Sequence, residues 1–446
     1  MNKKILDFNE RLKKSRVAII GLGVSNIPLL DYLYDLGCDV SIFSDKKIEI
    51  DLSKYKYPVY EGEDCLDKLV GFDIIFRSPG CLPTRKELVL EKERGAYITT
   101  EVEEVIKNCP CKVIGVTGSD GKTTTTTLID LVLRANGYKT FLGGNIGVPL
   151  FTKISEMHED DIVVLELSSF QLMGMDVSPS ISVITNISPN HLDKHKDFQE
   201  YVMAKCNIFK NSDDSVLVLN YDNEITRELK SKREIRYFSR YEKTNAFYVE
   251  NGYICYGDDS VFDTKRLHIR GIHNHENICA CMSALMGMVD LDKSFEAIEK
   301  FNGVEHRLEF VREINGVKWY NDSVSSSPTR TIAGLNSYDE DIVLIAGGYD
   351  KNLDYSPLAE PILSKVSKLI LFGDTKEKIY QAVMDKKKDE TIEIFKCNSL
   401  SEVVEKAYQV AKTGEVVLFS PASASFDMFK NFADRGIQFK EMVKGL

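Results

Sequence analysis

Residues 116–124 read Val-Thr-Gly-Ser-Asp-Gly-Lys-Thr-Thr. The apolar run at residues 112–115 predicts a buried strand before this stretch, and residues 125–137 predict a helix after it. At such a turn, backbone N–H groups and the helix dipole attract an anion, and Lys122 adds a positive charge. Thr123 offers a hydroxyl that can bind Mg²⁺. The stretch therefore predicts a phosphate-binding loop between a strand and a helix.

The spacing of this loop differs from the common pattern G-x-x-x-x-G-K-[ST]. That pattern requires a glycine where this chain has Val116. From this loop alone, an ordinary strand–turn–helix that carries a lysine by chance and binds no phosphate is the alternative.

The bulk composition restricts the class of protein. A chain of 446 residues is too long for one hydrophobic core, and about two to four domains are expected. With 43% hydrophobic and 28% charged residues, it has the composition of a globular protein. A net charge of −11 argues against a nucleic-acid partner, which would need a basic face. Ten cysteines without a C-x-x-C pair indicate reduced thiols.

No run of 18 apolar residues occurs, so we expect no membrane insertion. Residues 1–16 carry charges throughout and have no apolar segment typical of a signal peptide. We therefore expect a cytoplasmic protein.

The chain divides into three predicted domains, residues 1–100, 101–304 and 305–446. Each alternates apolar strands with helical patterns, which predicts an α/β fold with parallel strands. The strands that we expect are at residues 17–20, 40–43, 72–76, 112–115, 162–166, 181–185, 216–219, 342–346, 369–372 and 416–419. Residues 245–270 alternate and predict hairpins, and residues 274–288 predict a buried helix.

Polar residues follow several of these strands, where open α/β sheets bind ligands. Glu166 ends one strand in the same domain as the phosphate loop, and a carboxylate there suits Mg²⁺, although a solvated acid is the alternative. His191 could bind a second metal or a phosphate, whereas His195 is predicted to be an ordinary loop histidine. Lys205 lies on a helix, where a lysine is usually a surface group.

Nine motifs in order along almost the whole chain resemble the Mur ligases of peptidoglycan synthesis. The motifs are T-G-S-D-G-K-T-T, G-G-N-I-G, L-E-L-S-S-F-Q, N-H-L-D, A-K-x-x-I, H-N-x-x-N, H-R-x-E, N-D-S and S-P-A-S-A-S-F-D. An N-terminal G-L-G-x-S and a final K-N-F-x-x-R-G favour the D-glutamate-adding branch. The resemblance implies a Rossmann-like N-terminal domain, a central P-loop ATPase-like domain with a parallel sheet and a small β-hairpin region, and a C-terminal Rossmann-like domain.

The resemblance also implies an activity. ATP would phosphorylate the alanine carboxylate of UDP-N-acetylmuramoyl-L-alanine, and D-glutamate would attack the acyl phosphate through a tetrahedral intermediate, giving an amide, ADP and phosphate. Both substrates are small molecules, and a monomer is expected. Two Mg²⁺ ions would be held by Thr123, Glu166, His191 and Lys205, with Lys205 as a carbamate. Lys122, Glu166, His191 and Lys205 are thus the implied catalytic residues.

The remaining implied contacts fall into three sets. ATP would contact Gly118, Ser119, Asp120, Gly121, Lys122, Thr123, Thr124, Asn274, Asn277, Arg307 and Asp322. The UDP substrate would contact Gly23, Val24, Ser25, Ser44, Asp45, Lys46, Gly80 and Asn145. D-Glutamate would contact Ser326, Lys351, Ser425 and Phe432.

Two positions depart from the family pattern. The family's N-D-S-K-A-T has Val324 in place of its lysine, and Asn190 stands where an acid is common before the histidine. The charge that the lysine supplies elsewhere in the family must come from other groups here or be absent. Asn190 removes an anion that could support the metal site.

Other functions are compatible with parts of the sequence. An NAD-dependent oxidoreductase built on Gly21 and Gly23 lacks the third glycine, since Asn26 stands there. A phosphate-loop switch protein leaves the third domain without a role. Within the family, a diaminopimelate- or lysine-adding ligase or a folylpolyglutamate synthase is the alternative, but D-N-P-R is absent and Lys351 suits a carboxylate.

Overall fold

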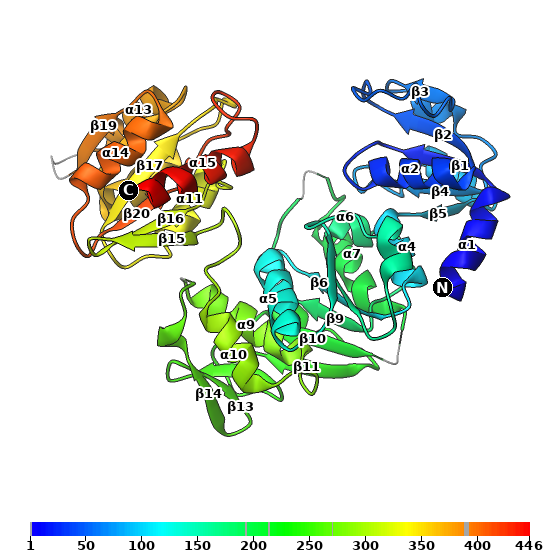
Figure 1. Cartoon of the computed structure of the whole chain (residues 1–446), viewed down its shortest axis with the longest axis horizontal. Helices are drawn as coiled ribbons and strands as arrows, with labels where there is room; N and C mark the ends of the chain where they lie inside the picture. The colour runs from blue at the N-terminus through cyan, green and yellow to red at the C-terminus, as the bar shows by residue number, and fades with distance from the viewer. Residues whose placement is uncertain (1, 192–193, 213–214, 270, 388–391) are drawn as a thin grey trace. The chain divides into compact units, whose positions relative to one another are not determined.

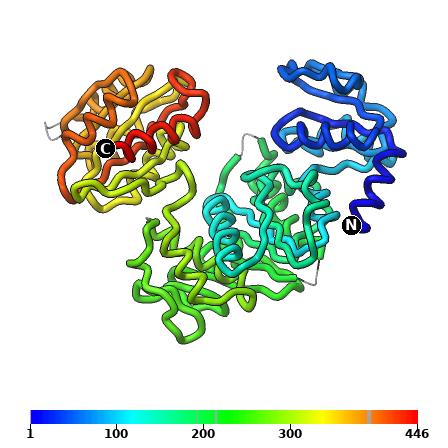
Figure 2. Tube along the Cα trace, in the orientation of Figure 1, coloured from blue at the N-terminus to red at the C-terminus, as the bar shows by residue number. Residues whose placement is uncertain are grey.

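The structure is a computed structural model that describes residues 2–191, 194–212, 215–269, 271–387 and 392–446. Contacts divide the chain into two compact units, Met1–Thr264 with His275–Ala297 and Lys265–Asn274 with Ile298–Leu446. The described strands form three larger sheets and one small sheet, and the chain completes each sheet before it begins the next (Figures 1 and 2). The α/β class is confirmed, whereas the boundaries after residues 100 and 304 stay predictions.

The first sheet is parallel, with strand order β3-β2-β1-β4-β5. Its strands are β1 Arg16–Ile20, β2 Asp39–Ser44, β3 Val59–Glu61, β4 Ile74–Arg77 and β5 Tyr97–Thr99. The helices of this stretch are α1 Lys3–Lys13, α2 Asn26–Leu36, η1 Cys65–Lys68 and α3 Lys86–Glu93. Both faces are covered by apolar side chains, as a parallel sheet requires.

The second sheet is also parallel, with order β11-β10-β9-β6-β8-β7. Its strands are β6 Lys112–Thr117, β7 Thr140–Gly144, β8 Ile162–Glu166, β9 Ile181–Ile184, β10 Val216–Asn220 and β11 Glu234–Phe238. The helices are α4 Glu101–Asn108, α5 Lys122–Ala135, η2 Phe151–Glu156, α6 Ser169–Leu172, α7 Phe198–Lys210 and α8 Glu224–Arg227. The strand order reverses at β6, between β8 and β9, which creates a crevice at their carboxyl ends.

The first two sheets share one hydrophobic core. Phe151 lies at its centre, with its ring centroid 6.0 Å from that of Phe8, 5.3 Å from that of Tyr32 and 6.4 Å from that of Phe76. Aromatic packing of this kind fixes the two sheets as parts of one unit.

A small antiparallel sheet confirms the hairpins predicted within residues 245–270. It consists of β12 Phe247–Glu250, β13 Tyr253–Tyr256 and β14 Asp259–Asp263. It is followed by η3 Thr264–Arg266, α9 Ile272–Ala284 and α10 Leu291–Glu299.

The second unit contains a six-stranded sheet of order β15-β16-β20-β17-β18-β19, parallel except for the pair β15–β16. Its strands are β15 Glu309–Ile314, β16 Val317–Asn321, β17 Ile342–Gly347, β18 Val366–Phe372, β19 Glu393–Lys396 and β20 Val416–Phe419. Its helices are α11 Pro328–Leu335, η4 Ser356–Leu358, α12 Ala359–Lys365, α13 Lys376–Lys386, α14 Leu400–Val410 and α15 Phe432–Gly445. Apolar residues of α11, α12 and α13 pack on one face, and those of α14 and α15 on the other.

Helix α5 begins at Lys122, three residues before the predicted start. The hydroxyls of Thr126 and Thr127 donate to the carbonyls of Lys122 and Thr123, each at 2.8 Å. A run of threonines has low helix propensity and no apolar period, so the sequence pattern hides this first turn.

No helix in the described part of the chain is both long and apolar enough to span a membrane.

Gly347, at the end of β17, has φ +125° and no room for a side chain. A Cβ built there would lie 1.9 Å from the Phe372 carbonyl oxygen, whereas one on Gly414, with φ +93°, would meet nothing within 4 Å. We predict that Gly414→Ala lowers the free energy of unfolding by about 1–2 kcal/mol, because alanine is strained at positive φ. Gly347→Ala should lower it by about 2–5 kcal/mol, because steric overlap with the Phe372 carbonyl adds to that strain. Fluorescence of Trp319, the single tryptophan, reports unfolding of this sheet. Equal losses in the two variants would contradict the steric argument.

Candidate functional site

The predicted phosphate loop lies at the crevice where the second sheet reverses its strand order. It connects β6 to α5 and packs against residues 185–188, which follow β9. Gly118 has φ +156°, and a Cβ there would lie 1.9 Å from Thr185 Oγ1. Gly121 has φ +78°, and its Cβ would lie 2.3 Å from Asn277 Oδ1. Both positions therefore require glycine.

The loop is held by hydrogen bonds from both sides. Thr185 Oγ1 donates to the Asp120 carbonyl at 2.5 Å, and the Asp120 N–H donates to Asn186 Oδ1 at 2.9 Å. The Ser188 N–H donates to Ser119 Oγ at 2.9 Å. Because the loop shape is fixed by these contacts, its geometry is preorganised for an anion.

Lys122 occupies the first position of α5, and its ammonium folds back over the loop. It donates to the carbonyls of Gly118 and Ser119, each at 2.9 Å. A positive charge is thus placed at the helix N-terminus, where the dipole also favours an anion. Thr123 and Thr124 follow on the same turn, with Thr124 buried.

Glu166 ends β8, next to β6, and only 1% of its surface is exposed. Its Oε1 accepts a hydrogen bond from Asn145 Nδ2 at 2.8 Å. Its Oε2 is buried and has no hydrogen-bond partner among the residues that the structure describes. A buried carboxylate oxygen left unsatisfied is unfavourable, so this atom has the properties of a metal ligand. Asn145 is thereby placed beside the predicted metal ligand.

Lys205 is not a surface lysine. It lies on α7 with 1% of its surface exposed, and its Nζ donates to the Gly118 carbonyl at 2.7 Å and to Thr117 Oγ1 at 3.4 Å. Burial lowers the pKa of Lys205 well below its usual value, and the charge of Lys122 lowers it further. The ordinary interpretation of this residue, a snorkelling surface group, is wrong.

His191 and His195 both contact the Phe170 ring. His191 is exposed at φ +55°, and its ring contacts Phe170 edge-on, with centroids 5.4 Å apart. His195 is buried, stacks on Phe170 at 5.0 Å, and its Nε2 lies 2.9 Å from Ser169 Oγ. His195 is thus a buried loop residue packed against α6. Leu192 and Asp193 of the N-H-L-D motif lie outside the described residues.

Two predicted nucleotide residues, Asn274 and Asn277, lie in the first two turns of α9. Asn277 is buried, and its Oδ1 accepts from Thr125 Oγ1 at 3.4 Å, which places it against the phosphate loop helix. Asn274 is buried in the other unit. Among the described residues, no cluster of three or more His, Cys, Asp or Glu side chains forms a ready-made metal site.

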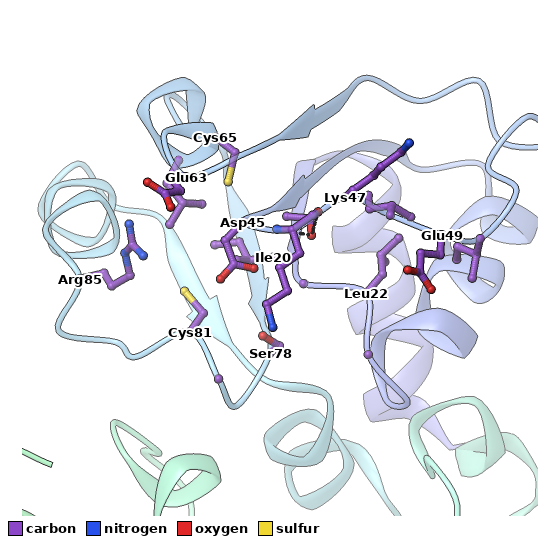
Figure 3. Close-up of a pocket in the computed structure, with 18 residues that line it drawn as sticks. Ile20, Leu22, Asp45, Lys47, Glu49, Glu63, Cys65, Ser78, Cys81 and Arg85 are labelled. Carbon is purple, nitrogen blue, oxygen red and sulfur yellow. Dashed lines mark hydrogen bonds between the residues drawn. The ribbon is translucent and has the colours of Figure 1, made fainter. Parts of the chain in front are cut away.

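The first sheet has a separate cavity of about 640 Å³ at the carboxyl ends of its strands (Figure 3). Five of the eight residues predicted for the UDP substrate line it: Gly23, Ser44, Asp45, Lys46 and Gly80. Asp45 and Arg85 reach it from different segments, as Figure 3 shows. Val24 is exposed and Ser25 precedes α2, while Asn145 follows β7 of the second sheet and donates to Glu166.

In the second unit, Asp322 follows β16 and is buried, with 2% of its surface exposed. It accepts hydrogen bonds from Ser420 Oγ at 2.7 Å and from the Leu308 N–H at 3.2 Å. Burial raises the pKa of Asp322 to about 6. The neighbouring Arg307 is exposed.

Of the four residues predicted for D-glutamate, three lie in the loops after β16, β17 and β20, and the fourth begins α15. Lys351 is exposed, and its ammonium lies 5.5 Å from the centroid of the Phe426 ring. Ser425 is buried, Ser326 is partly buried, and Phe432 is exposed at the start of α15. An exposed lysine beside an aromatic ring is suited to binding a carboxylate.

The sequence interpretation gave no role to Arg435, although it lies in the K-N-F-x-x-R-G motif. Arg435 is fully buried, and its guanidinium donates to Ser323 Oγ and to the carbonyls of Ser323, Ser423 and Ala424. It therefore fixes the loops that carry Ser326 and Ser425. Burial lowers the pKa of Arg435 to about 10, which leaves it charged at neutral pH.

A preorganised phosphate loop beside a buried carboxylate and a buried lysine defines an α/β protein that binds nucleotide phosphates. A model of the Mur ligase middle domain matches residues 116–285, and a model of the Mur ligase glutamate ligase domain matches residues 306–423. The chain belongs to the Mur ligase family.

Relatives with assigned functions match over their full length. A UDP-N-acetylmuramoylalanine–D-glutamate ligase of Clostridium botulinum (strain 657) is 49% identical over 459 residues, covering 100% of both chains. The enzyme of the same name from Clostridium kluyveri is 48% identical over 458 residues, with the same coverage.

Solved structures with low sequence identity share the fold. A UDP-N-acetylmuramate–alanine ligase of Thermotoga maritima has a TM-score of 0.59 at 19% identity, covering 97% of this chain and 99% of that one. A MurF ligase of the same organism, solved with ADP, has a TM-score of 0.55 at 18% identity, covering 98% and 96%.

The unpartnered oxygen of Glu166 yields a prediction. Glu166→Gln keeps an acceptor for Asn145 but removes a buried charge, so without metal we expect a melting temperature equal to or higher than that of the wild type. Saturation with Mg²⁺ and nucleotide at about 100 Kd should stabilise the wild type by about 2.7 kcal/mol and the variant by much less. Thermal melts with and without EDTA measure both effects.

The control for this prediction is Glu156→Gln, an exposed acid on η2. It should respond to Mg²⁺ and nucleotide as the wild type does. Full ligand stabilisation of Glu166→Gln would exclude Glu166 as a metal ligand.

Proposed function

We propose that this chain ligates D-glutamate to UDP-N-acetylmuramoyl-L-alanine at the expense of ATP, in cytoplasmic peptidoglycan precursor synthesis. One observation carries the proposal: Glu166 places an unpartnered carboxylate oxygen beside the phosphate loop, in a chain that matches D-glutamate ligases over their full length. We also propose three domains at residues 1–100, 101–304 and 305–446.

The first step joins two anions. A carboxylate oxygen of the alanine attacks the γ-phosphorus of ATP, the bond to the bridging oxygen breaks, and ADP leaves. Lys122 and the N–H groups of the loop would bind the phosphates and stabilise the charge that they carry in the transition state.

The second step forms the amide. The amine of D-glutamate, having lost a proton, attacks the acyl-phosphate carbonyl, and the tetrahedral intermediate expels phosphate. Lys351 and Ser425 would bind the carboxylates of D-glutamate and so orient its amine. Arg435 would keep the loop of Ser425 in place.

The residues around the phosphate loop fit Mg²⁺. Glu166 Oε2 is an unsatisfied hard oxygen, and Thr123 supplies a hydroxyl at the helix start. His191 would hold a second ion. When bound, Mg²⁺ neutralises the charge of the phosphates.

We further propose that Lys205 is carbamylated. The uncharged amine attacks CO₂, an N–C bond forms, and one proton is released to solvent. Its buried position and lowered pKa favour the uncharged amine that this reaction needs. The product is a carbamate anion. It would place two oxygen ligands, in place of an ammonium group, next to the proposed metal ligands.

Product formation tests the function. Purified protein is incubated with ATP, Mg²⁺, UDP-N-acetylmuramoyl-L-alanine and a panel of D- and L-amino acids, and ADP and the amide are measured. We expect ADP release with D-glutamate and the mass of the D-glutamyl product. Preference for diaminopimelate or lysine would contradict the proposal.

The carbamate gives the next prediction. Lys205→Ala should reduce turnover by roughly 10² or more, as removal of preorganised electrostatic groups does, and a short carboxylic acid in the buffer should restore part of it. In wild-type protein, ¹³C-bicarbonate should give a carbamate signal in NMR. Because protonation of the amine reverses the reaction, that signal should fall as the pH is lowered.

Lys210→Ala on the exposed end of α7 is the matched control and should keep both activity and signal. A fully active Lys205→Ala, or wild type without the carbamate signal, would rule out carbamylation.

Lys351 gives a prediction about specificity. A charge-assisted hydrogen bond contributes about 1.5–3 kcal/mol, so Lys351→Ala should raise the KM for D-glutamate about 10- to 150-fold and leave the KM for ATP nearly unchanged. Lys378→Ala removes a nearby lysine that pairs with Asp350 and serves as the control. A selective loss of ATP affinity in Lys351→Ala would assign this residue to the nucleotide instead.

A further inference from the structure

Arg77, the last residue of β4, joins two functional regions of the first unit. Only 3% of its surface is exposed, and its guanidinium donates to three backbone carbonyls. Nη1 donates to the Cys81 carbonyl at 3.2 Å, both Nη1 and Nη2 donate to the Phe170 carbonyl at 3.3 Å, and Nη2 donates to the Met173 carbonyl. Cys81 lines the cavity of the first sheet, while Phe170 and Met173 belong to α6 and its C-terminal cap.

Helix α6 needs hydrogen-bond donors at its C-terminal end, and Arg77 supplies them. This helix is a single turn, too short to be stable alone, and its last carbonyls have no partner within the helix. Its start is fixed by a capping box of Ser168 and Gln171. Arg77 fixes its end, because a cation with several donors satisfies carbonyls at a helix C-terminus.

Helix α6 carries the groups around the proposed metal site. It starts three residues after Glu166. Its Phe170 ring stacks on His195 and contacts His191 edge-on, and its Ser169 hydroxyl lies 2.9 Å from His195 Nε2. A shift of α6 would therefore move the histidines together with the segment that follows Glu166.

Arg77 also contacts the turn that lines the cavity of the first sheet. Ser78, Gly80 and Cys81 follow this arginine directly and line the cavity, and the Ser78 N–H donates to the Ile20 carbonyl on β1. A ligand that orders this turn also fixes the Cys81 carbonyl that Arg77 binds. The buried guanidinium of Arg77 thus connects the turn that lines the cavity to helix α6, next to the proposed metal site.

We propose that Arg77 is a positioning residue that couples occupancy of the first-sheet cavity to the geometry of the site around Glu166 and His191. The identity of the ligands rests on the proposed function: a uridine nucleotide in the cavity and Mg²⁺–nucleotide at the phosphate loop. The coupling is reciprocal, so each ligand raises the affinity for the other by the same factor.

A thermodynamic cycle tests the coupling. The Kd of UDP-N-acetylmuramoyl-L-alanine is measured by calorimetry with and without saturating Mg²⁺–ADP, a pair that cannot react. We expect the wild type to bind about fivefold tighter or more with Mg²⁺–ADP, and Arg77→Lys to lose the effect, with a ratio below about two. Lysine keeps the charge but lacks the fork of donors that reaches three carbonyls.

Steady-state kinetics separate positioning from loss of structure. Arg77→Lys should lower kcat by about tenfold or more, which corresponds to at least 1.4 kcal/mol, while the KM for D-glutamate stays within about threefold. Arg94→Lys, an exposed arginine of the first domain that pairs with Glu91, should match the wild type in coupling and kcat.

A measurement on the wild type covers the case in which Arg77→Lys does not fold. UDP-N-acetylmuramoyl-L-alanine alone, without ATP, should slow hydrogen exchange at residues 168–173. Unchanged exchange in protein that binds this ligand, a wild-type ratio of one, or full coupling in folded Arg77→Lys would each overturn the proposal. Binding and exchange need no turnover, so a wild type that couples the ligands but makes no D-glutamyl product would refute only the proposed function.

Discussion

The tight packing of residues 118–121 against the chain that follows β9 is the constraint on which the central site depends. Gly118 leaves no space for a Cβ beside Thr185, and the Thr185 hydroxyl holds the Asp120 carbonyl. Because residues 185–188 hold the loop in one shape, its N–H groups and the Lys122 ammonium form a rigid, positively charged site.

Buried charge is the second determinant of the site. Lys122 and Lys205 both donate to the Gly118 carbonyl, and burial together with the Lys122 charge lowers the pKa of Lys205. This shift favours the uncharged amine, which is the nucleophilic form. Bound phosphates would draw a proton back onto a free amine, so the proposed carbamate is formed most readily before the nucleotide binds. Metal ions would then offset the repulsion between carbamate and phosphate.

The sequence predicted the three α/β sheets because buried parallel strands are nearly continuous apolar runs. It missed the edge strands of all three sheets, β3, β5, β7, β11, β15 and β19, because edge strands are short or half-exposed and lack a continuous apolar run. It also placed the start of α5 too late, because threonines conceal the first turn. Glu166 was identified from its position at a strand end. The importance of His195 and Arg435 could not be predicted, because it depends on Ser169, Phe170 and the loops after β16 and β20, which only the folded chain brings to them.

Glu166 illustrates why support from outside the site matters. Asn145 binds one of its oxygens, while the other is buried without a hydrogen-bond partner, so within the described part of the chain a single hydrogen bond orients this carboxylate. The direction of the free oxygen then depends on the backbone at the end of β8 and on α6 behind it. That backbone is stabilised from the first sheet, through the shared core around Phe151 and the carbonyls that Arg77 binds. A buried carboxylate with a single hydrogen bond is unfavourable alone, and the surrounding unit keeps it in place for a cation.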